Sequence, residues 1–340
     1  MIRCAVVGAT GFTGVELIKI LVRHPGVSLT ALTTRQENAI PVNTLIPTLS
    51  HKSLLTVRSY TFAELRKSAD LFFICLPHTE AAETADKLYR AGKTVIDLSA
   101  DARLKNASDY KFWYGYQHPV PSILKKAVYG LPEIHRNEIR KADLIANPGC
   151  YPTSAVLALW PLIQRKLICL DSIIIDSKSG VSGAGKKLSP ATHFCEVAGN
   201  FKAYKVNQHQ HTPEIEQTLS EQAGKKVKVT FVPHLLPIDR GILSTIYTRR
   251  NPKVTPLQIV RAFQETYEKE PFVRFRGQGV FPAIKDVVGT NFCDIGVAVD
   301  STEDRVIVIS AIDNLLKGAS GQAVQNMNVR YAFPEDEGLL

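Results

Sequence analysis

Cys150 has the sequence surroundings of a reactive thiol. It stands in the run Asn-Pro-Gly-Cys-Tyr-Pro-Thr (147–153), between an apolar strand-like stretch and an apolar helical run. Pro148 and Gly149 predict a turn, and Pro152 suits the first turn of a helix. A thiol at a helix start faces the positive end of the helix dipole, which favours the thiolate. These surroundings favour a nucleophile, although a small apolar residue buried at a turn fits the local pattern equally well.

The five other cysteines lack such a setting. They are Cys4, Cys75, Cys169, Cys195 and Cys293. The first three lie in apolar segments and are expected to pack there. Because no two of the six cysteines have Cys-x-x-Cys spacing and no His/Cys cluster is present, neither a disulfide framework nor a metal site is predicted.

Two histidines could move a proton near such a thiol. His209 and His211 flank Gln210 at the start of a predicted helix, on an extended approach where alternate residues share a face. We expect His211 to act as the acid or base and His209 to contact the substrate. A structural role is the alternative for either histidine.

Chemistry on an acyl group also needs an oxyanion hole and a cation for an anionic leaving group. The backbone amide of Cys150 and the side chain of Asn147 are candidates for the oxyanion hole. Arg103 is the candidate cation, because it follows the strand-like stretch 94–98, and ligands bind at the carboxyl ends of strands in open α/β sheets. A salt bridge between Arg103 and Asp101 is an equally good interpretation.

A glycine-rich turn near the N-terminus is typical of dinucleotide binding. Gly8, Gly11 and Gly14 stand between a strand-like run, 2–7, and a helical run, 15–23. Such glycines allow a tight turn and close approach of a pyrophosphate, which the helix N-terminus then binds. A simple tight turn is the alternative. The other candidate cofactor contacts in this turn are Thr10, Phe12 and Thr13.

The end of the second predicted strand bears on which cofactor binds. Sites that prefer NAD place an acidic residue there to hold the ribose hydroxyls. Here Thr33, Thr34 and Arg35 come first, and the first carboxylate is Glu37. An arginine beside two hydroxyls suits a 2′-phosphate, so we expect NADP (NADPH), although Arg35 could be an ordinary surface residue. Ser99, after the strand-like stretch 94–98, is a further candidate cofactor contact.

A nucleophilic thiol beside a hydride carrier indicates reduction of an activated acyl group. The thiolate would form a thioester and expel the leaving group. Hydride addition would then give a thiohemiacetal that collapses to an aldehyde. These residues together predict an oxidoreductase that acts on an aldehyde or oxo group.

The elements that must position these residues fall into two parts. Up to residue 148, short continuous apolar strands alternate with helices, which is typical of a parallel sheet covered on both faces. Beyond it the strands are longer, with helices between them. We predict a Rossmann-like doubly wound α/β domain for NADP over 1–148, completed by a C-terminal helix at 314–340. An α+β domain with a mixed sheet, over 149–313, would serve catalysis, substrate binding and oligomerisation.

Composition limits the choice of partners. The chain has 340 residues, of which 45% are hydrophobic and 21% charged, and its formal charge is +9. Lys and Arg are dispersed, so a small anionic substrate is expected rather than nucleic acid. No apolar run approaches the roughly 20 residues that span a bilayer. Because the N-terminus enters a strand with no signal-like segment before it, we expect a cytoplasmic protein with no membrane partner.

The ordered set of motifs resembles one family. The motifs occupy residues 8–14, 97–103, 129–133, 147–153, 179–185, 209–215, 233–241 and 313–323. Over nearly the whole chain, this set resembles the N-acetyl-gamma-glutamyl-phosphate reductases (type 1) of the semialdehyde dehydrogenase family. The resemblance implies NADPH-dependent reduction of N-acetyl-gamma-glutamyl phosphate to N-acetylglutamate 5-semialdehyde and phosphate, through a thioester on Cys150, in arginine biosynthesis.

The resemblance also implies roles that spacing leaves open. Ser182 and Gly183 would meet the substrate, and Arg240 would help to shape its pocket. Asn314 and Gly318 would line the nicotinamide end of the cofactor site, although the segment around Gly318 could equally be a small-residue helix start that packs closely. A homo-oligomer, either a dimer or a tetramer, is implied. The chain departs from many relatives at residue 210, where a glutamine replaces an arginine, which could change substrate affinity but not the reaction.

Three other functions stay open. An aspartate-semialdehyde dehydrogenase is disfavoured by the His-x-His-Thr-Pro-Glu and Pro-His-Leu segments. An N-acetyl-aminoadipyl-phosphate reductase of lysine synthesis is not excluded by any spacing. A noncatalytic NADP-binding sensor would tolerate loss of Cys150 and His211, so their joint presence favours an enzyme.

Overall fold

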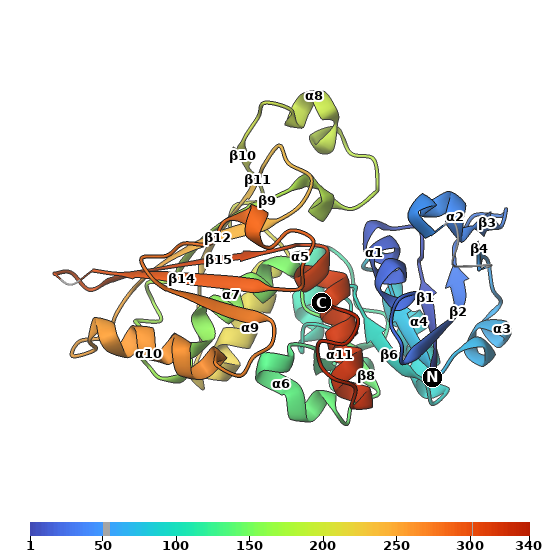
Figure 1. The fold of residues 1–340 in the computed structure, drawn as a ribbon, viewed down its shortest axis with the longest axis horizontal. Helices are drawn as coiled ribbons and strands as arrows, with labels where there is room; N and C mark the ends of the chain where they lie inside the picture. Colours follow the sequence, from blue (N-terminus) through green and yellow to red (C-terminus); the bar gives the residue numbers. More distant parts are fainter. Residues whose placement is uncertain (50–54, 301) are drawn as a thin grey trace. The chain divides into compact units, whose positions relative to one another are not determined.

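The chain forms two compact units. The computed structural model describes residues 1–49, 55–300 and 302–340 (Figure 1). The first unit comprises Met1–Pro148 and Ala319–Leu340, and the second comprises Gly149–Gly318. The chain therefore rejoins the first unit at Ala319, later than the return at residue 314 that the sequence suggested.

The first unit is built on an eight-stranded sheet whose order is β3–β4–β2–β1–β5–β6–β8–β7. All neighbouring strands are parallel except β3 and β4. The strands are β1 (Ile2–Val7), β2 (Val27–Thr33), β3 (Ile40–Pro41), β4 (Thr56–Arg58), β5 (Leu71–Ile74), β6 (Thr94–Asp97), β7 (Val128–Tyr129) and β8 (Leu144–Ala146).

Helices cover both faces of this sheet. Cys4 and Val6 of β1 join one buried apolar cluster, whereas Ala5 and Val7 join another, because successive strand residues point to opposite faces. The helices of this unit are α1 (Phe12–Leu21), α2 (Val42–Leu45), α3 (Phe62–Ser68), α4 (Ala81–Arg90), α5 (Ala107–Tyr114), α6 (Pro132–Ile139) and α11 (Gly321–Tyr331). The predicted doubly wound α/β architecture is confirmed.

The second unit has a seven-stranded mixed sheet in the order β10–β11–β9–β12–β15–β14–β13. β9 and β11 are parallel, as are β13 and β14, and the other neighbours are antiparallel. The strands are β9 (Ile174–Ser179), β10 (Lys202–Ala203), β11 (Thr230–Leu235), β12 (Ile242–Arg249), β13 (Val273–Gln278), β14 (Cys293–Val299) and β15 (Arg305–Ile312). The predicted mixed sheet is therefore confirmed.

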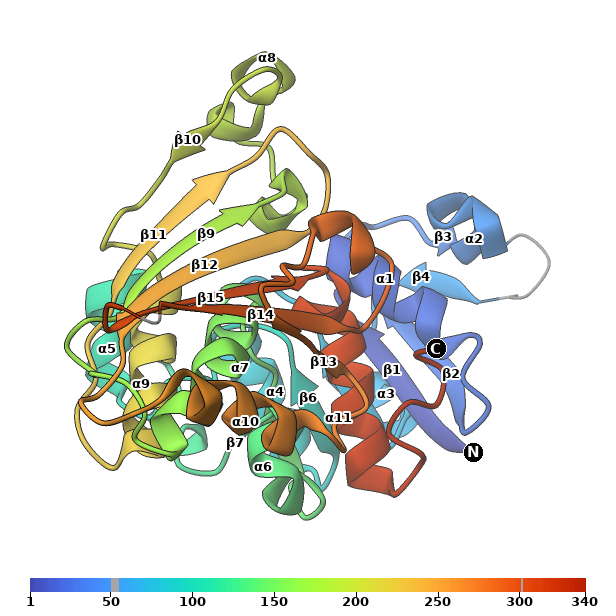
Figure 2. The ribbon, with the colours of Figure 1, turned by 60° about the vertical axis from the view of Figure 1, so that its left-hand side comes forward.

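Three long helices cover one face of that sheet (Figure 2). They are α7 (Cys150–Gln164), α9 (His211–Ala223) and α10 (Pro256–Tyr267), and the short α8 (Phe194–Val197) lies on an excursion between β9 and β10. Ser154 of α7 bonds through its hydroxyl to Ser244 of β12 and Ser310 of β15. These buried bonds fix the position of α7 on the sheet.

Two segments differ from the sequence expectation. A strand was expected from residue 226, but β11 begins at Thr230, because α9 side chains accept the backbone N–H groups of Val227 and Val229. The C-terminal helix was expected to run from residue 314. Leu316–Ser320 is instead a π-helical turn, closed by a bond from Gly318 N to Asp313 O at 2.9 Å, and α11 follows it. Such π turns occur frequently at functional sites.

Candidate active site

Cys150 is the first residue of α7 and is partly exposed, whereas residues 151–159 after it are buried. Gly149 is the N-cap, no side chain caps the helix, and its first turn holds no acidic residue. The helix dipole at this end favours a thiolate. Pro152 lies in the first turn, where its missing N–H is tolerated.

A buried carboxylate fixes the turn before the cysteine. Glu214 of α9 is fully buried, and its Oε1 accepts the N–H of Gly149 at 2.8 Å. This charge-assisted bond ties the start of α7 to α9. Glu214 was assigned no role from the sequence. An acidic residue at a predicted helix start was the available signal, and its burial is known only from the fold.

Gly318 packs directly against Cys150. A Cβ added at Gly318 would lie 2.7 Å from Cys150 Cβ and 3.2 Å from Cys150 Cα. Only a residue without a side chain allows this approach. Close packing was one interpretation of the small residues around Gly318, and Cys150 is the residue against which Gly318 packs.

His209 and His211 occupy different environments. His211 is the first residue of α9 and is partly exposed, whereas His209 is buried. His209 Nδ1 accepts the N–H of His211 at 3.0 Å. Burial, and then the charge of Lys205, lower the pKa of His209 to about 3. His209 is therefore neutral near pH 7 and unsuited to proton transfer there, which favours His211 as the acid or base and gives His209 a positioning role.

Tyr151 connects the cysteine to the histidines. Its ring meets the edge of His209 at 5.4 Å and of His211 at 5.8 Å between centroids. Its hydroxyl lies 3.1 Å from that of Tyr204, and burial raises the pKa of Tyr151. Sequence reasoning missed this residue, because a tyrosine after a cysteine gives no signal until the fold brings the histidines to it.

The segment 180–185 brings Ser182 and Gly183, which were expected at the substrate, next to Asn314, which was expected at the nicotinamide end of the cofactor site. Asn314 donates to Ser182 Oγ at 3.0 Å and accepts the N–H of Gly241 at 2.7 Å. Gly183 is adjacent, since a Cβ there would lie 3.8 Å from Asn314 Nδ2. Ser182, Gly183 and Asn314 therefore lie together in the second unit.

Asp313 holds Arg240 in place. The Arg240 Nη2 atom lies 3.1 Å from both carboxylate oxygens of Asp313, which is fully buried. Asp313 also accepts the backbone N–H groups of Gly289, Leu315 and Leu316. This carboxylate, to which the sequence gave no role, therefore fixes both Arg240 and the start of the π-helical turn.

In the first unit, Asn147 is fully buried. Its Nδ2 donates to Ala319 O at 3.1 Å, and its Oδ1 accepts from Asn326 at 3.0 Å. These contacts favour a structural role and give no support to the expected place of Asn147 in an oxyanion hole. Its partner Asn326 lies far away in the sequence, so local reasoning could not foresee the bond.

Arg103 and Ser99 lie at the carboxyl ends of β6 and β8. Arg103 donates to the carbonyl oxygens of Asn147 and Leu98, each at 2.8 Å. Ser99 donates to Asp97 at 2.9 Å. Burial, and then the charge of Asp101, raise the pKa of Asp97 to about 6. Both candidates therefore lie at the carboxyl ends of parallel strands, where they were expected.

The glycine-rich turn leaves room for a ligand. A Cβ at Gly8 (φ +92°) would lie 2.6 Å from Cys75 O, and one at Gly14 would lie 2.6 Å from Gly8 O, so the fold itself requires both glycines. A Cβ at Gly11 would meet a single atom, at an ordinary 3.8 Å. Gly11 is the N-cap of α1, and no side chain caps this helix, which is the setting in which helix starts bind anions.

Three further residues expected at the cofactor, Thr10, Phe12 and Thr13, lie in or directly after this turn. Thr10 lies within it, and Phe12 begins α1 and is 37% exposed. Thr13 accepts a bond from Ser320 to its carbonyl at 2.8 Å, which ties α1 to the segment before α11. Arg35 follows β2 and is exposed.

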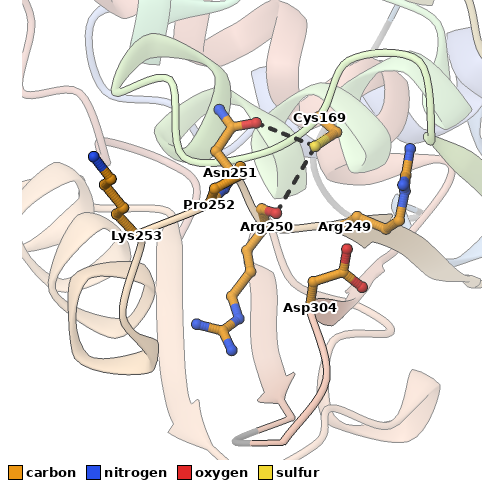
Figure 3. Close-up of a pocket in the computed structure, with 7 residues that line it drawn as sticks. All are labelled: Cys169, Arg249, Arg250, Asn251, Pro252, Lys253 and Asp304. Carbon is orange, nitrogen blue, oxygen red and sulfur yellow. Dashed lines mark hydrogen bonds between the residues drawn. The ribbon is translucent and has the colours of Figure 1, made fainter.

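A further cavity of about 260 Å³ lies at the other end of α7. It is lined by Cys169, Arg249, Arg250, Asn251, Pro252, Lys253 and Asp304 (Figure 3). Cys150 begins α7 and Cys169 follows its end, and a helix of 15 residues spans about 22 Å. Cys169 Sγ donates to Asn251 Oδ1 and to the carbonyl oxygen of Arg250, and no histidine is among the residues that line the cavity. Among the described residues, no cluster of His, Cys, Asp and Glu could hold a metal ion.

Comparison with known proteins agrees with these features. The semialdehyde dehydrogenase NAD binding domain matches residues 3–142, and the semialdehyde dehydrogenase dimerisation domain matches residues 150–314. N-acetyl-gamma-glutamyl-phosphate reductase of Pelotomaculum thermopropionicum is 52% identical over 99% of this chain and 97% of its own length. The protein of the same name from Geobacter metallireducens is 51% identical over 100% of this chain and 98% of its own.

Solved structures share the fold at low identity. Aspartate semialdehyde dehydrogenase II of Vibrio cholerae, complexed with ASA, has a TM-score of 0.72 and 17% identity, covering 98% of each chain. Aspartate semialdehyde dehydrogenase of Candida albicans, solved with NADP, has a TM-score of 0.66 and 16% identity over 98% of this chain and 99% of its own. No helix among the described residues is long and apolar enough to cross a bilayer. The chain belongs to the semialdehyde dehydrogenase family, in the group of the N-acetyl-gamma-glutamyl-phosphate reductases, as its motifs predicted.

Proposed function

We propose that this protein reduces N-acetyl-gamma-glutamyl phosphate to N-acetylglutamate 5-semialdehyde and phosphate with NADPH, as a step of arginine biosynthesis. One observation carries the proposal. Cys150 and His211 each begin a helix and are each partly exposed, and the ring of Tyr151, the residue after Cys150, packs against that of His211 at 5.8 Å between centroids. The full-length relatives that bear the name of this activity support the same choice.

Cys150 acts as the nucleophile in this proposal. Its sulfur bonds to the acyl carbon, the bond from that carbon to the phosphate oxygen breaks, and phosphate leaves with the bonding electrons. The start of α7 favours the thiolate, and the N–H groups of its first turn can stabilise negative charge on the acyl oxygen. The acyl group is then held as a thioester.

Proton transfer falls to His211. A bound nicotinamide cofactor supplies the hydride. His211 gives a proton to the acyl oxygen as the thiohemiacetal forms and takes it back as the aldehyde leaves. His209 positions His211 through the bond to its N–H, and Arg240 and Ser182 are proposed to contact the substrate.

NADPH rather than NADH is proposed as the cofactor. Arg35 follows β2, is exposed, and has the hydroxyls of Thr33 and Thr34 before it. Thr33 Oγ1 also accepts the N–H of Gly8 at 3.1 Å, which links this strand end to the glycine-rich turn. These contacts support a 2′-phosphate site at the end of β2.

The open face of the second sheet supports a homodimer. Tyr247 pairs with Ile174 on one side and Ile307 on the other, so the three side chains form a row across β9, β12 and β15. Ile174 is 44% exposed and Tyr247 38% exposed. A second copy of the chain would bury this apolar row.

A Cys150→Ser variant tests the proposed chemistry. The variant should still bind NADPH but should form no acyl-enzyme detectable by mass spectrometry, because serine lacks the thiolate. Cys169→Ser, which changes a cysteine at the other end of α7, serves as the matched control and should keep its activity.

The assay is phosphate-dependent NADP reduction with N-acetylglutamate semialdehyde and with homologues one methylene longer and shorter. Appreciable turnover by Cys150→Ser would contradict the thioester route. A higher kcat/KM with the longer homologue would favour the aminoadipyl phosphate instead.

A further inference from the structure

Arg35 and Glu80 form an ion pair next to the glycine-rich turn. Arg35 follows β2, Glu80 immediately precedes α4, and Arg35 Nη2 lies 2.7 Å from Glu80 Oε2. The side chain of Arg35 is 72% exposed and that of Glu80 is 36% exposed. Within the described ranges, no other carboxylate lies within ion-pair distance of Arg35. The Arg35 side chain is therefore accessible to an anion from solvent.

Both partners come from loops that contact Gly8. The end of β2 accepts the N–H of Gly8 through Thr33. The loop after β5, which leads to Glu80, lies so close that a Cβ on Gly8 would be 2.6 Å from Cys75 O. The ion pair thus joins the two loops that border the turn proposed to bind the cofactor.

The backbone around Glu80 is held in a strained conformation. Thr79 has a φ of +78°, a region that β-branched residues rarely adopt. Asp101 accepts the N–H groups of Thr79, Ala81 and Ala82 at 2.9, 3.1 and 3.1 Å, on both sides of Glu80. Strain that the surrounding structure maintains is a mark of functional sites. We therefore attribute a function to the position of Glu80.

We infer that Glu80 limits the preference for NADPH over NADH. It is the counterion of Arg35, and the 2′-phosphate of NADPH must displace it. This inference rests on the proposed use of NADPH. An exposed ion pair contributes little to holding Arg35. Removing the Glu80 carboxylate therefore changes the position of Arg35 little. It also removes the repulsion between this carboxylate and the 2′-phosphate, which compete for the Arg35 guanidinium. At about 4 Å in water this repulsion corresponds to roughly fivefold in affinity for each unit charge.

A Glu80→Gln variant of the full-length protein tests this inference. Dissociation constants for NADPH and for NADH are measured by fluorescence titration without substrate, at low and at high salt. We expect NADPH to bind at least about fivefold more tightly than to the parent protein, because a 2′-phosphate carries more than one negative charge. NADH should bind as before, and the gain for NADPH should shrink at high salt.

Glu83→Gln is the matched control. It removes the same charge from the first turn of α4, three residues after Glu80, but Glu83 pairs with Lys87 at 3.8 Å rather than with Arg35. This variant should leave both dissociation constants unchanged. If Glu80→Gln leaves the ratio of the two constants unchanged, or shifts both cofactors equally, Glu80 is not a specificity residue.

Failure of the proposed cofactor preference would be recognised separately. A parent protein that binds NADH as tightly as NADPH would contradict the proposed function itself. Arg35→Gln should weaken the binding of NADPH alone. If it does not, Arg35 is not the ligand of the 2′-phosphate, and the inference about Glu80 falls with it.

Discussion

Replacement of Gly318 by alanine would place a methyl group where Cys150 already lies. The new Cβ would be 2.7 Å from Cys150 Cβ, whereas carbon atoms pack at about 3.5–4.0 Å. Gly318 cannot retreat freely, because its N–H bonds to Asp313 O and the new Cβ would lie 3.3 Å from that same oxygen. Cys150 must therefore move by about 1 Å, and a misplacement of that size lowers the rate about 100-fold.

The assay compares kcat/KM for N-acetylglutamate semialdehyde with the rate of Cys150 alkylation, in the Gly318→Ala variant and the parent. Both should fall, and thermal unfolding shows whether the variant is folded. Gly224→Ala is the control, because Gly224 ends α9 at φ +65° with no atom within 4 Å of an added Cβ. It should lower stability through backbone strain without moving Cys150.

An undiminished kcat/KM in folded Gly318→Ala would refute this reasoning. It would mean that the start of α7 can adjust without loss of reactive geometry. A fall in activity matched by Gly224→Ala would also count against it, because stability alone would then explain the loss.

Two further predictions follow from the burial of His209 and the backbone of Thr79. His209 has a pKa of about 3 in the folded protein, so the unfolded chain binds the extra proton below about pH 6.5, and stability falls as pH falls. Between pH 7 and pH 5 this group should contribute a loss of about 2 kcal/mol. Urea unfolding of His209→Asn should show a correspondingly shallower pH dependence, and an unchanged slope would contradict the assignment. Thr79→Gly should raise the free energy of unfolding by about 0.5–1 kcal/mol, because glycine adopts φ +78° without strain. A lower midpoint of urea unfolding would argue against strain at this position.

Local patterns in the sequence were sufficient to predict the features that depend on neighbouring residues alone. The glycine-rich turn follows β1 and precedes α1, as expected, because Gly8 and Gly14 are needed by contacts within and next to the turn. The turn at Pro148 and Gly149 places Cys150 at the start of a helix, because proline and glycine restrict the local backbone. The parallel and mixed sheets also followed from the lengths and spacing of apolar runs.

The sequence could not assign roles that depend on contacts between distant residues. The spacing of His209 and His211 could not decide which of them moves the proton, and the burial of His209 among aromatic rings separates them. Asn147 was expected at an oxyanion, but Asn326 and Ala319, from the C-terminal end of the chain, occupy its side chain. Burial and hydrogen bonding change the chemistry of a side chain, and neither is local in sequence.

The sequence by itself determined the fold class and the places of Cys150 and of the glycine-rich turn, because each depends on backbone preferences or apolar periodicity over a few residues. Only the tertiary structure decided how Cys150 is held. Gly318 packs against Cys150, although the two residues are more than 160 positions apart in the sequence. Glu214 of α9 accepts the N–H of Gly149, in the turn before Cys150. Close packing and buried charge act through space, so their partners became known only when the chain was folded.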